Sequence, residues 1–126
     1  TLEDSVFFYE PVKNIQEKYL ESSIYVMSSR FEGFGLVLLE AMACGVPGIG
    51  TRIGGIPEVI DHGKNGYIVE LGDTDAVAAY ALEILSDDAK LEKFRKAAFA
   101  TISEKFQSEM IVAQYEEVYA RLVGEV

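Results

Sequence analysis

The chain has 126 residues, 49% of them hydrophobic and 25% charged, which fits a single globular domain over residues 1–126 and leaves no room for a second one. A formal net charge of −10 without any local basic patch argues against nucleic acid as a partner. One cysteine and one histidine exclude an internal disulfide and a cysteine-rich zinc site. With no apolar run long enough to cross a bilayer, the sequence predicts a cytoplasmic protein without a transmembrane segment.

The first quarter of the chain predicts two buried strands with a helix between them. The apolar runs at 6–8 and 24–27 each end in turn-like residues, as strands do. Between them, Asn14 and Glu17 have the spacing of a capping box. The helix that they begin has an apolar side made of Ile15, Tyr19 and Leu20.

The middle of the chain alternates helices and strands. A turn at 33–35 leads into a strong helix former over 36–43, which is apolar nearly all round and is therefore expected to be buried. Strands are predicted over 47–51 and 66–69. Between these strands, Pro57 fits the first turn of a short helix that ends near Asp61.

The last part of the chain predicts helices only. Asp73 is the expected cap of a helix through Leu85, with Val77, Ala81, Leu82 and Leu85 on its apolar side. Two further segments carry apolar residues at helical spacing, namely Leu91, Phe94, Ala98, Ile102 and Phe106, then Ile111, Tyr115, Val118 and Leu122. This order of elements predicts an α/β class, with a parallel sheet flanked by helices.

The segment 32–40 carries the candidate chemistry. It lies after a predicted parallel strand, where open α/β sheets bind ligands, and a helix begins inside it. The first free N–H groups of that helix favour a phosphate or diphosphate. Glu32 and Glu40 flank this anion site, and carboxylates accept hydrogen bonds from sugar hydroxyls. Gly33 and Gly35 would let the backbone approach such a ligand closely.

A plain structural interpretation fits the same spacing equally well. Glu32 could be a solvated loop residue, Glu40 an exposed helix residue, and the glycines ordinary turn residues. Glycine-rich corners between strands and helices are common, so the spacing alone leaves both interpretations open.

A resemblance to a known family favours the ligand-binding interpretation. The run from Ser29 to Pro47 resembles the signature of retaining glycosyltransferases of family 4, also called glycosyl transferases group 1. Its sequence is Ser-Arg-Phe-Glu-Gly-Phe-Gly-Leu-Val-Leu-Leu-Glu-Ala-Met-Ala-Cys-Gly-Val-Pro, and Gly-Gly-Ile-Pro-Glu follows it and continues the resemblance. The family has a GT-B fold of two Rossmann-like domains. From Phe34 onward the chain is most similar to the N-acetylglucosaminyl-malate synthases of bacillithiol synthesis.

The resemblance implies a function for each residue of the motif. Glu32 would be the catalytic residue that contacts hydroxyls of the donor sugar, within a backbone loop that includes Gly33. Phe34 and Gly35 would offer backbone N–H groups to the sugar, Leu36 and Val37 would face the diphosphate, and Glu40 would bind the ribose hydroxyls. The donor implied is a nucleotide sugar such as a UDP-sugar, and neither a metal nor another cofactor is required.

Two departures from the family pattern point to a second hypothesis. Glu10 stands where the family has glycine, near the expected base pocket. The family's Arg/Lys pair that grips the diphosphate, and its N-terminal acceptor domain, are not in this sequence, so we expect a C-terminal part truncated on its N-terminal side and inactive alone. The alternative is a non-catalytic half-domain that self-associates as a homo-oligomer through an exposed sheet edge.

Three weaker signals have simpler explanations. Asp73-Thr74-Asp75 matches a manganese-binding motif of a different glycosyltransferase fold, but its place at a helix start predicts a cap. His62 precedes Gly63 and is expected in a loop. A receiver domain would need aspartates at strand ends, and the predicted strands at 6–8 and 24–27 do not supply them.

Overall fold

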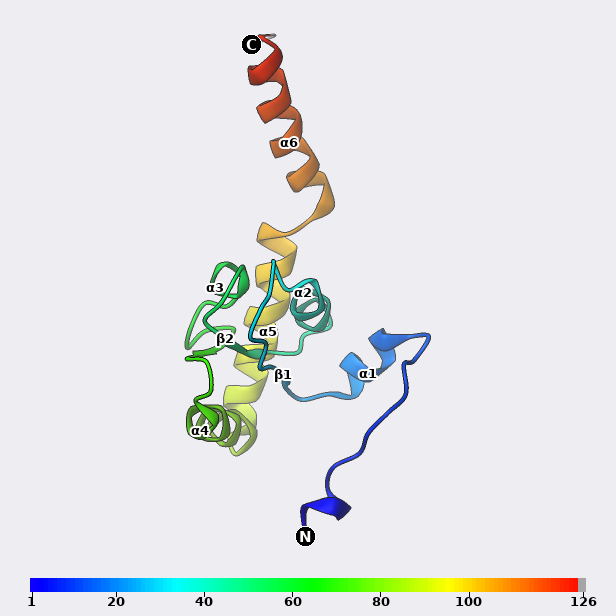
Figure 1. The fold of residues 1–126 in the computed structure, drawn as a ribbon, viewed down its shortest axis with the longest axis vertical. Helices are drawn as coiled ribbons and strands as arrows, with labels where there is room; N and C mark the ends of the chain where they lie inside the picture. The colour runs from blue at the N-terminus through cyan, green and yellow to red at the C-terminus, as the bar shows by residue number, and fades with distance from the viewer. Residues whose placement is uncertain (125–126) are drawn as a thin grey trace.

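The computed structural model describes residues 1–124 and contains a parallel sheet flanked by helices (Figure 1). The three strands, in the order β1-β2-β3, are β1 (Tyr25–Met27), β2 (Gly48–Thr51) and β3 (Gly66–Val69). Ile49 at the centre of β2 pairs with Val26 on one side and with Tyr67 on the other. The predicted α/β class and the three later strands are therefore confirmed.

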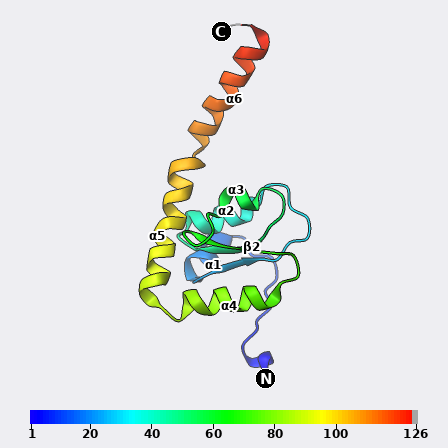
Figure 2. The same ribbon diagram turned by 90° about the vertical axis from the view of Figure 1, so that its left-hand side faces the viewer.

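The helices form layers on both faces of this sheet (Figure 2). They are α1 (Ile15–Glu21), α2 (Leu36–Ala43), α3 (Ile56–Val59), α4 (Thr74–Leu85), α5 (Asp88–Lys105) and α6 (Ser108–Val123), after a 3₁₀ turn at Leu2–Asp4. Figure 2 shows α2 and α3 over one face and α4 over the other, while α6 points away from the sheet. Within residues 1–124, no helix is both long and apolar enough to span a bilayer.

Two glycines in β2 allow α2 and α3 to pack closely on the sheet. A Cβ added to Gly48 would lie 2.4 Å from Cδ1 of Leu38 in α2, and one added to Gly50 would lie 2.8 Å from Cγ2 of Ile56 in α3. Ile49 packs instead on the opposite face, in the core cluster that also contains Ile84. Since α2 packs directly on β2, this contact fixes the position of the α2 N-terminus relative to the ends of the strands.

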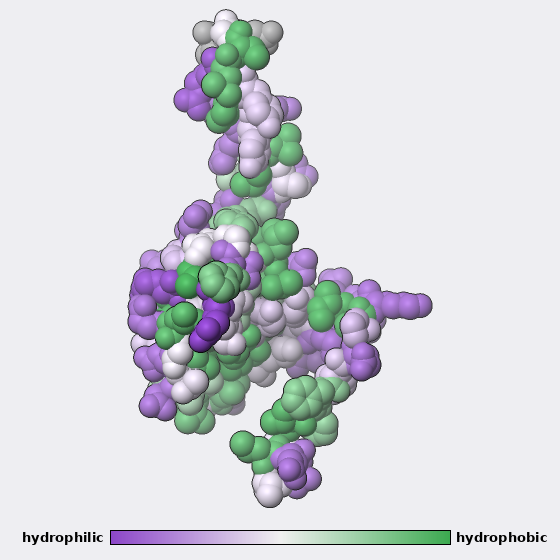
Figure 3. Space-filling model, viewed as in Figure 1, coloured by the Kyte–Doolittle hydropathy of each residue, from purple (hydrophilic) through white to green (hydrophobic). Residues whose placement is uncertain are grey.

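The strand predicted at residues 6–8 is absent, and that prediction is wrong. Residues 5–14 have no regular structure, and Phe8 is 96% exposed. Figure 3 shows hydrophobic surface on the N-terminal segment, which projects below the rest of the molecule. A short apolar run becomes a strand only when a neighbouring strand supplies hydrogen bonds and cover for both faces, and this segment pairs with none of β1, β2 and β3. Its apolar side chains therefore remain open to solvent.

The helix boundaries were predicted well, but some helix faces were not. Leu36 and Val37 are exposed, so α2 is not buried all round as expected. In α4, Leu82 is 68% exposed and Ile84 is fully buried. Both helices are apolar on more than one side, so periodicity alone could not select the stripe that meets the sheet. At α1, the Asn14 side chain donates to Glu17 instead of capping the helix backbone.

A buried asparagine fastens the loop between α3 and β3 to α5. The Asn65 side chain accepts the Asp61 N–H at 2.8 Å and donates to the carbonyl of Val59 at 3.2 Å and to Thr101 Oγ1 at 2.8 Å. His62 lies in the same loop, as expected, where its Nδ1 accepts the Ile68 N–H at 3.0 Å. Both polar side chains serve the fold here, because Asn65 satisfies backbone groups of Val59 and Asp61 and His62 satisfies the N–H of Ile68 in β3.

Candidate functional site

The predicted anion site is the N-terminus of α2, and the structure begins this helix at Leu36, where the sequence predicted it. Gly35 is the N-cap with φ +90°, a left-handed conformation that favours glycine, and no side chain caps the helix. The N–H groups of Leu38 and Leu39 both reach the Gly35 carbonyl. The N–H groups before them have no partner within the helix, so the first turn of α2 can donate to an anion.

A second loop supports the one that leads into α2. The Gly55 N–H donates to the Gly33 carbonyl at 2.8 Å. A Cβ on Gly54 would lie 1.8 Å from the Glu32 carbonyl oxygen, and one on Gly55 would lie 2.6 Å from Cδ2 of Phe34. Sequence reasoning placed Gly54 and Gly55 in a loop but missed this role. Two adjacent glycines without an evident turn were the available signal.

Glu32 is half-buried beside the end of the sheet. Its carboxylate accepts a long hydrogen bond of 3.5 Å from the Ser29 hydroxyl. The Ser29 carbonyl in turn accepts the hydroxyl of the buried Thr51, at 2.7 Å, where β2 ends. The loop that carries Glu32 is thus fixed to β2 below it and to the Gly54 loop beside it.

Glu40 lies on the exposed side of α2, one turn after the helix start. Its Oε2 accepts the Tyr19 hydroxyl at 3.4 Å. Burial raises the pKa of Tyr25, and the negative charges of Glu32 and Glu40 raise it further. The two tyrosine rings meet edge to face, with centroids 5.9 Å apart. Sequence reasoning did not predict these tyrosines as part of the site.

The other predicted site residues form the surface between the two carboxylates. Leu36 and Val37 are exposed at the helix start, and their backbone N–H groups precede the first hydrogen bonds of α2. Gly33 has nothing within 4 Å of an added Cβ and a negative φ, so its own conformation does not require glycine. The structure thus brings all of the predicted residues together in one loop and the helix after it, and of these, Phe34 and Leu36 also line a cavity.

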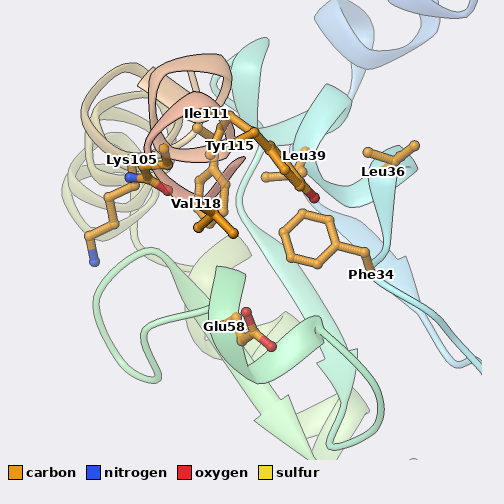
Figure 4. Close-up of a pocket in the computed structure, with 10 residues that line it drawn as sticks. Phe34, Leu36, Leu39, Glu58, Lys105, Ile111, Tyr115 and Val118 are labelled. Atoms are coloured by element: carbon orange, nitrogen blue, oxygen red, sulfur yellow. The ribbon is translucent and has the colours of Figure 1, made fainter. Parts of the chain in front are cut away.

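This cavity separates the loop from α6 and has a volume of about 710 Å³. Phe34 and Glu58 lie on one side, and Ile111, Tyr115 and Val118 of α6 lie on the other (Figure 4). Glu32 and Glu40 are outside it. The cavity is therefore a mostly apolar space beside the predicted anion site and does not include the two carboxylates.

The candidate metal motif is a helix cap. Asp73 Oδ1 accepts the Ala76 N–H at 3.0 Å at the start of α4, as predicted. Among residues 1–124, no group of three histidine, cysteine, aspartate or glutamate side chains is arranged to hold a metal ion. Glu10 is exposed on the irregular segment, beside a cavity that Lys18 also lines.

A family model described as Glycosyl transferases group 1 matches residues 1–101 of the chain. The chain belongs to this family. The N-acetyl-alpha-D-glucosaminyl L-malate synthase of Bacillus anthracis is 49% identical to this group 1 chain over 118 residues. The match covers 94% of the chain but only 31% of that relative. This group 1 chain therefore spans about a third of the relative's length.

Solved structures agree on the fold of this group 1 chain. The C-terminal domain of a group 1 glycosyl transferase, LpcC of Francisella tularensis, matches with a TM-score of 0.72 and 31% identity, over 82% of this chain and 53% of that one. Anabaena Alr3699/HepE, solved in complex with UDP, matches with a TM-score of 0.78 and 27% identity, over 83% of this chain and 29% of that one. The predicted Rossmann-like sheet of a GT-B C-terminal domain is therefore confirmed.

Proposed function

We propose that this chain binds the nucleotide-sugar donor, most simply a UDP-sugar, of a retaining glycosyltransferase of family 4. The observation that carries the proposal is the uncapped start of α2, which lies between the carboxylates of Glu32 and Glu40. Anabaena HepE, a structural relative, was solved with UDP and with UDP-glucose, which supports a donor of this kind.

In this proposal the helix start binds the diphosphate and the carboxylates bind hydroxyls on either side. The backbone N–H groups of Gly35, Leu36 and Val37 donate to phosphate oxygens, and the peptide dipoles of α2 stabilise the charge that grows on the leaving diphosphate. Glu32 accepts hydrogen bonds from the donor sugar and Glu40 from the ribose. Because these groups supply the stabilisation, the proposal needs no metal.

Transfer itself requires more than this chain. The acceptor would be bound by a part of the protein that corresponds to the remaining two thirds of the relatives' length. The basic residues that bind the diphosphate would also lie in that part. We therefore expect these 126 residues to bind the donor in an assay but not to transfer its sugar. The similarity to the B. anthracis synthase suggests N-acetylglucosamine as the donor sugar.

Titration calorimetry with UDP tests the donor site directly. We expect UDP to bind the wild-type chain and the Glu40→Ala variant to bind it at least about tenfold more weakly, because hydrogen bonds to a charged partner are lost. The matched control is Glu104→Ala, which removes an exposed carboxylate of α5 and should leave the affinity unchanged. A folded wild-type chain that gives no binding with UDP would contradict the proposal.

A second candidate function is self-association without catalysis. It is favoured by the irregular segment near the N-terminus, in which Phe7 is 70% and Phe8 is 96% exposed, and by the unpaired edge of β1. Light scattering should then give at least twice the mass of one chain, and Phe8→Ser should reduce it. Phe99→Ser, at an exposed site on α5, should not. A monomeric wild-type chain rules this candidate out.

A further inference from the structure

Tyr19 is the residue that joins α1 to the exposed side of α2. It is the only one of the seven residues of α1 that is buried, and its ring packs in a cluster with Ala41 of α2 and Val46. Tyr25 of β1 meets the same ring edge to face, with an angle of 87° between the ring planes. Three elements, α1, α2 and β1, and the loop that carries Val46 therefore fix the position of this phenol.

The Tyr19 hydroxyl is a dependable hydrogen-bond donor. Burial and the neighbouring Glu40 carboxylate raise the pKa of Tyr19 to about 12. The phenol therefore stays protonated throughout the physiological pH range, and its hydroxyl donates a hydrogen bond to Oε2 of Glu40 at 3.4 Å. A raised pKa also means that folding favours the protonated phenol, so this contribution to stability is present below pH 10 and is lost toward pH 12.

The contact changes what the Glu40 carboxylate can do. Glu40 is exposed, and a free glutamate on a helix surface samples several rotamers, whose loss on binding a ligand costs free energy. Tyr19 occupies one carboxylate oxygen, and the second, Oε1, keeps its full capacity to accept hydrogen bonds. Glu40 follows Leu36 by four residues, so the two side chains lie on the same face of α2, and the Cα–Cβ bond of Glu40 tilts toward the helix N-terminus, where the N–H groups are free.

We propose that Tyr19 is a positioning residue for the donor: its hydroxyl holds Glu40 so that the free carboxylate oxygen meets the ribose hydroxyls of a nucleoside diphosphate bound at the start of α2. This inference rests on the proposed function and adds to it a residue from a different helix. Tyr25 packs against the Tyr19 ring but makes no hydrogen bond to either carboxylate among the described side chains.

A double-mutant cycle in titration calorimetry tests the role of Tyr19. Tyr19→Phe removes the hydroxyl and keeps the ring, and we expect it to weaken UDP binding about threefold to tenfold. The affinity for 2′,3′-dideoxy-UDP, which has no ribose hydroxyls for Glu40, should stay the same. In a Glu40→Ala background, which removes the acceptor of the Tyr19 hydroxyl, Tyr19→Phe should have much less effect than in the wild-type chain, because the two residues act through one contact.

The matched control is Tyr67→Phe. Tyr67 is also buried and also donates its hydroxyl to a glutamate, Glu83, at 2.7 Å, but it lies on the α4 side of the sheet. This variant should bind UDP as the wild-type chain does. If Tyr19→Phe binds UDP as tightly as the wild type, or weakens UDP and the dideoxy analogue equally, the inference is wrong, because a structural defect would affect both ligands.

A titration without any ligand checks the contact independently. The pKa values can be followed in NMR spectra of chains that carry ¹³C-labelled tyrosine. The pKa of Tyr19, about 12 in the wild-type chain, should be lower in the Glu40→Gln variant, whereas the pKa of Tyr67 should be the same in both. An unchanged Tyr19 pKa would overturn the inference whether or not UDP binds. A wild-type chain that binds no UDP contradicts the proposed donor site, whereas UDP binding that ignores Tyr19→Phe contradicts the role of Tyr19 only.

Discussion

Gly54→Ala is expected to lower the affinity for UDP by more than about tenfold and the free energy of unfolding by about 1 to 3 kcal/mol. The added Cβ would lie 1.8 Å from the carbonyl oxygen of Glu32, a backbone atom that can move only with its loop. Gly54 also has φ +50°, where a Cβ adds strain of its own. The loop that carries Glu32 and leads into α2 must therefore shift. Calorimetry with UDP and urea unfolding measure the two effects.

Gly72→Ala separates the clash from the strain. Gly72 has a similar positive φ, of +84°, but nothing lies within 4 Å of its added Cβ. This variant should lose some stability and keep its affinity for UDP. Equal UDP affinity in the Gly54→Ala and wild-type chains would show that the Glu32 loop is not held by its glycine neighbour, or that it does not contact the donor.

Leu38→Ala is expected to lower the free energy of unfolding by about 3 kcal/mol. Leu38 is fully buried where α2 rests on the sheet, in the cluster with Met42, Ile56 and Ile68. Removing its side chain leaves a cavity above Gly48, which has no side chain to fill the space. Urea unfolding followed by circular dichroism measures the loss.

The comparison variant is Leu82→Ala, the same change in another helix. Leu82 is 68% exposed, so its truncation should change stability by less than about 0.5 kcal/mol. Similar losses in both variants would mean that α2 does not pack on β2 as closely as the structure shows.

The sequence predicted most element boundaries because local signals mark them. Gly35 and Gly45 delimit α2, and the acceptor side chain of Asp73 begins α4. The strand at 6–8 failed because pairing is not a local property: an apolar run cannot show whether a neighbour exists. The stripe of α4 that meets the sheet was predicted correctly at Val77 and Ala81 but wrongly at Leu82, since Leu82 and Ile84 are equally apolar and only packing distinguishes them.

The candidate site shows the same division. Residues 32–40 are contiguous, so the motif itself revealed the loop, the helix start and both carboxylates. Tyr19 and Gly54 come from elements far from this motif in the chain, and their contacts with Glu40 and Glu32 exist only after folding. Whether the predicted residues bind a donor stays a prediction until UDP is titrated.

The direction of α6 sets the shape of the cavity beside the candidate site. The helix leaves α5 at Gln107 and runs for 16 residues, about 24 Å at 1.5 Å per residue. A swing of about 10° about that break displaces Ile111 by about 1 Å and Val118 by about 3 Å, because Val118 lies farther along the arm. A small rotation of α6 about Gln107, in the direction away from Phe34, would therefore widen the cavity most beside Val118 without displacing the loop that carries Glu32.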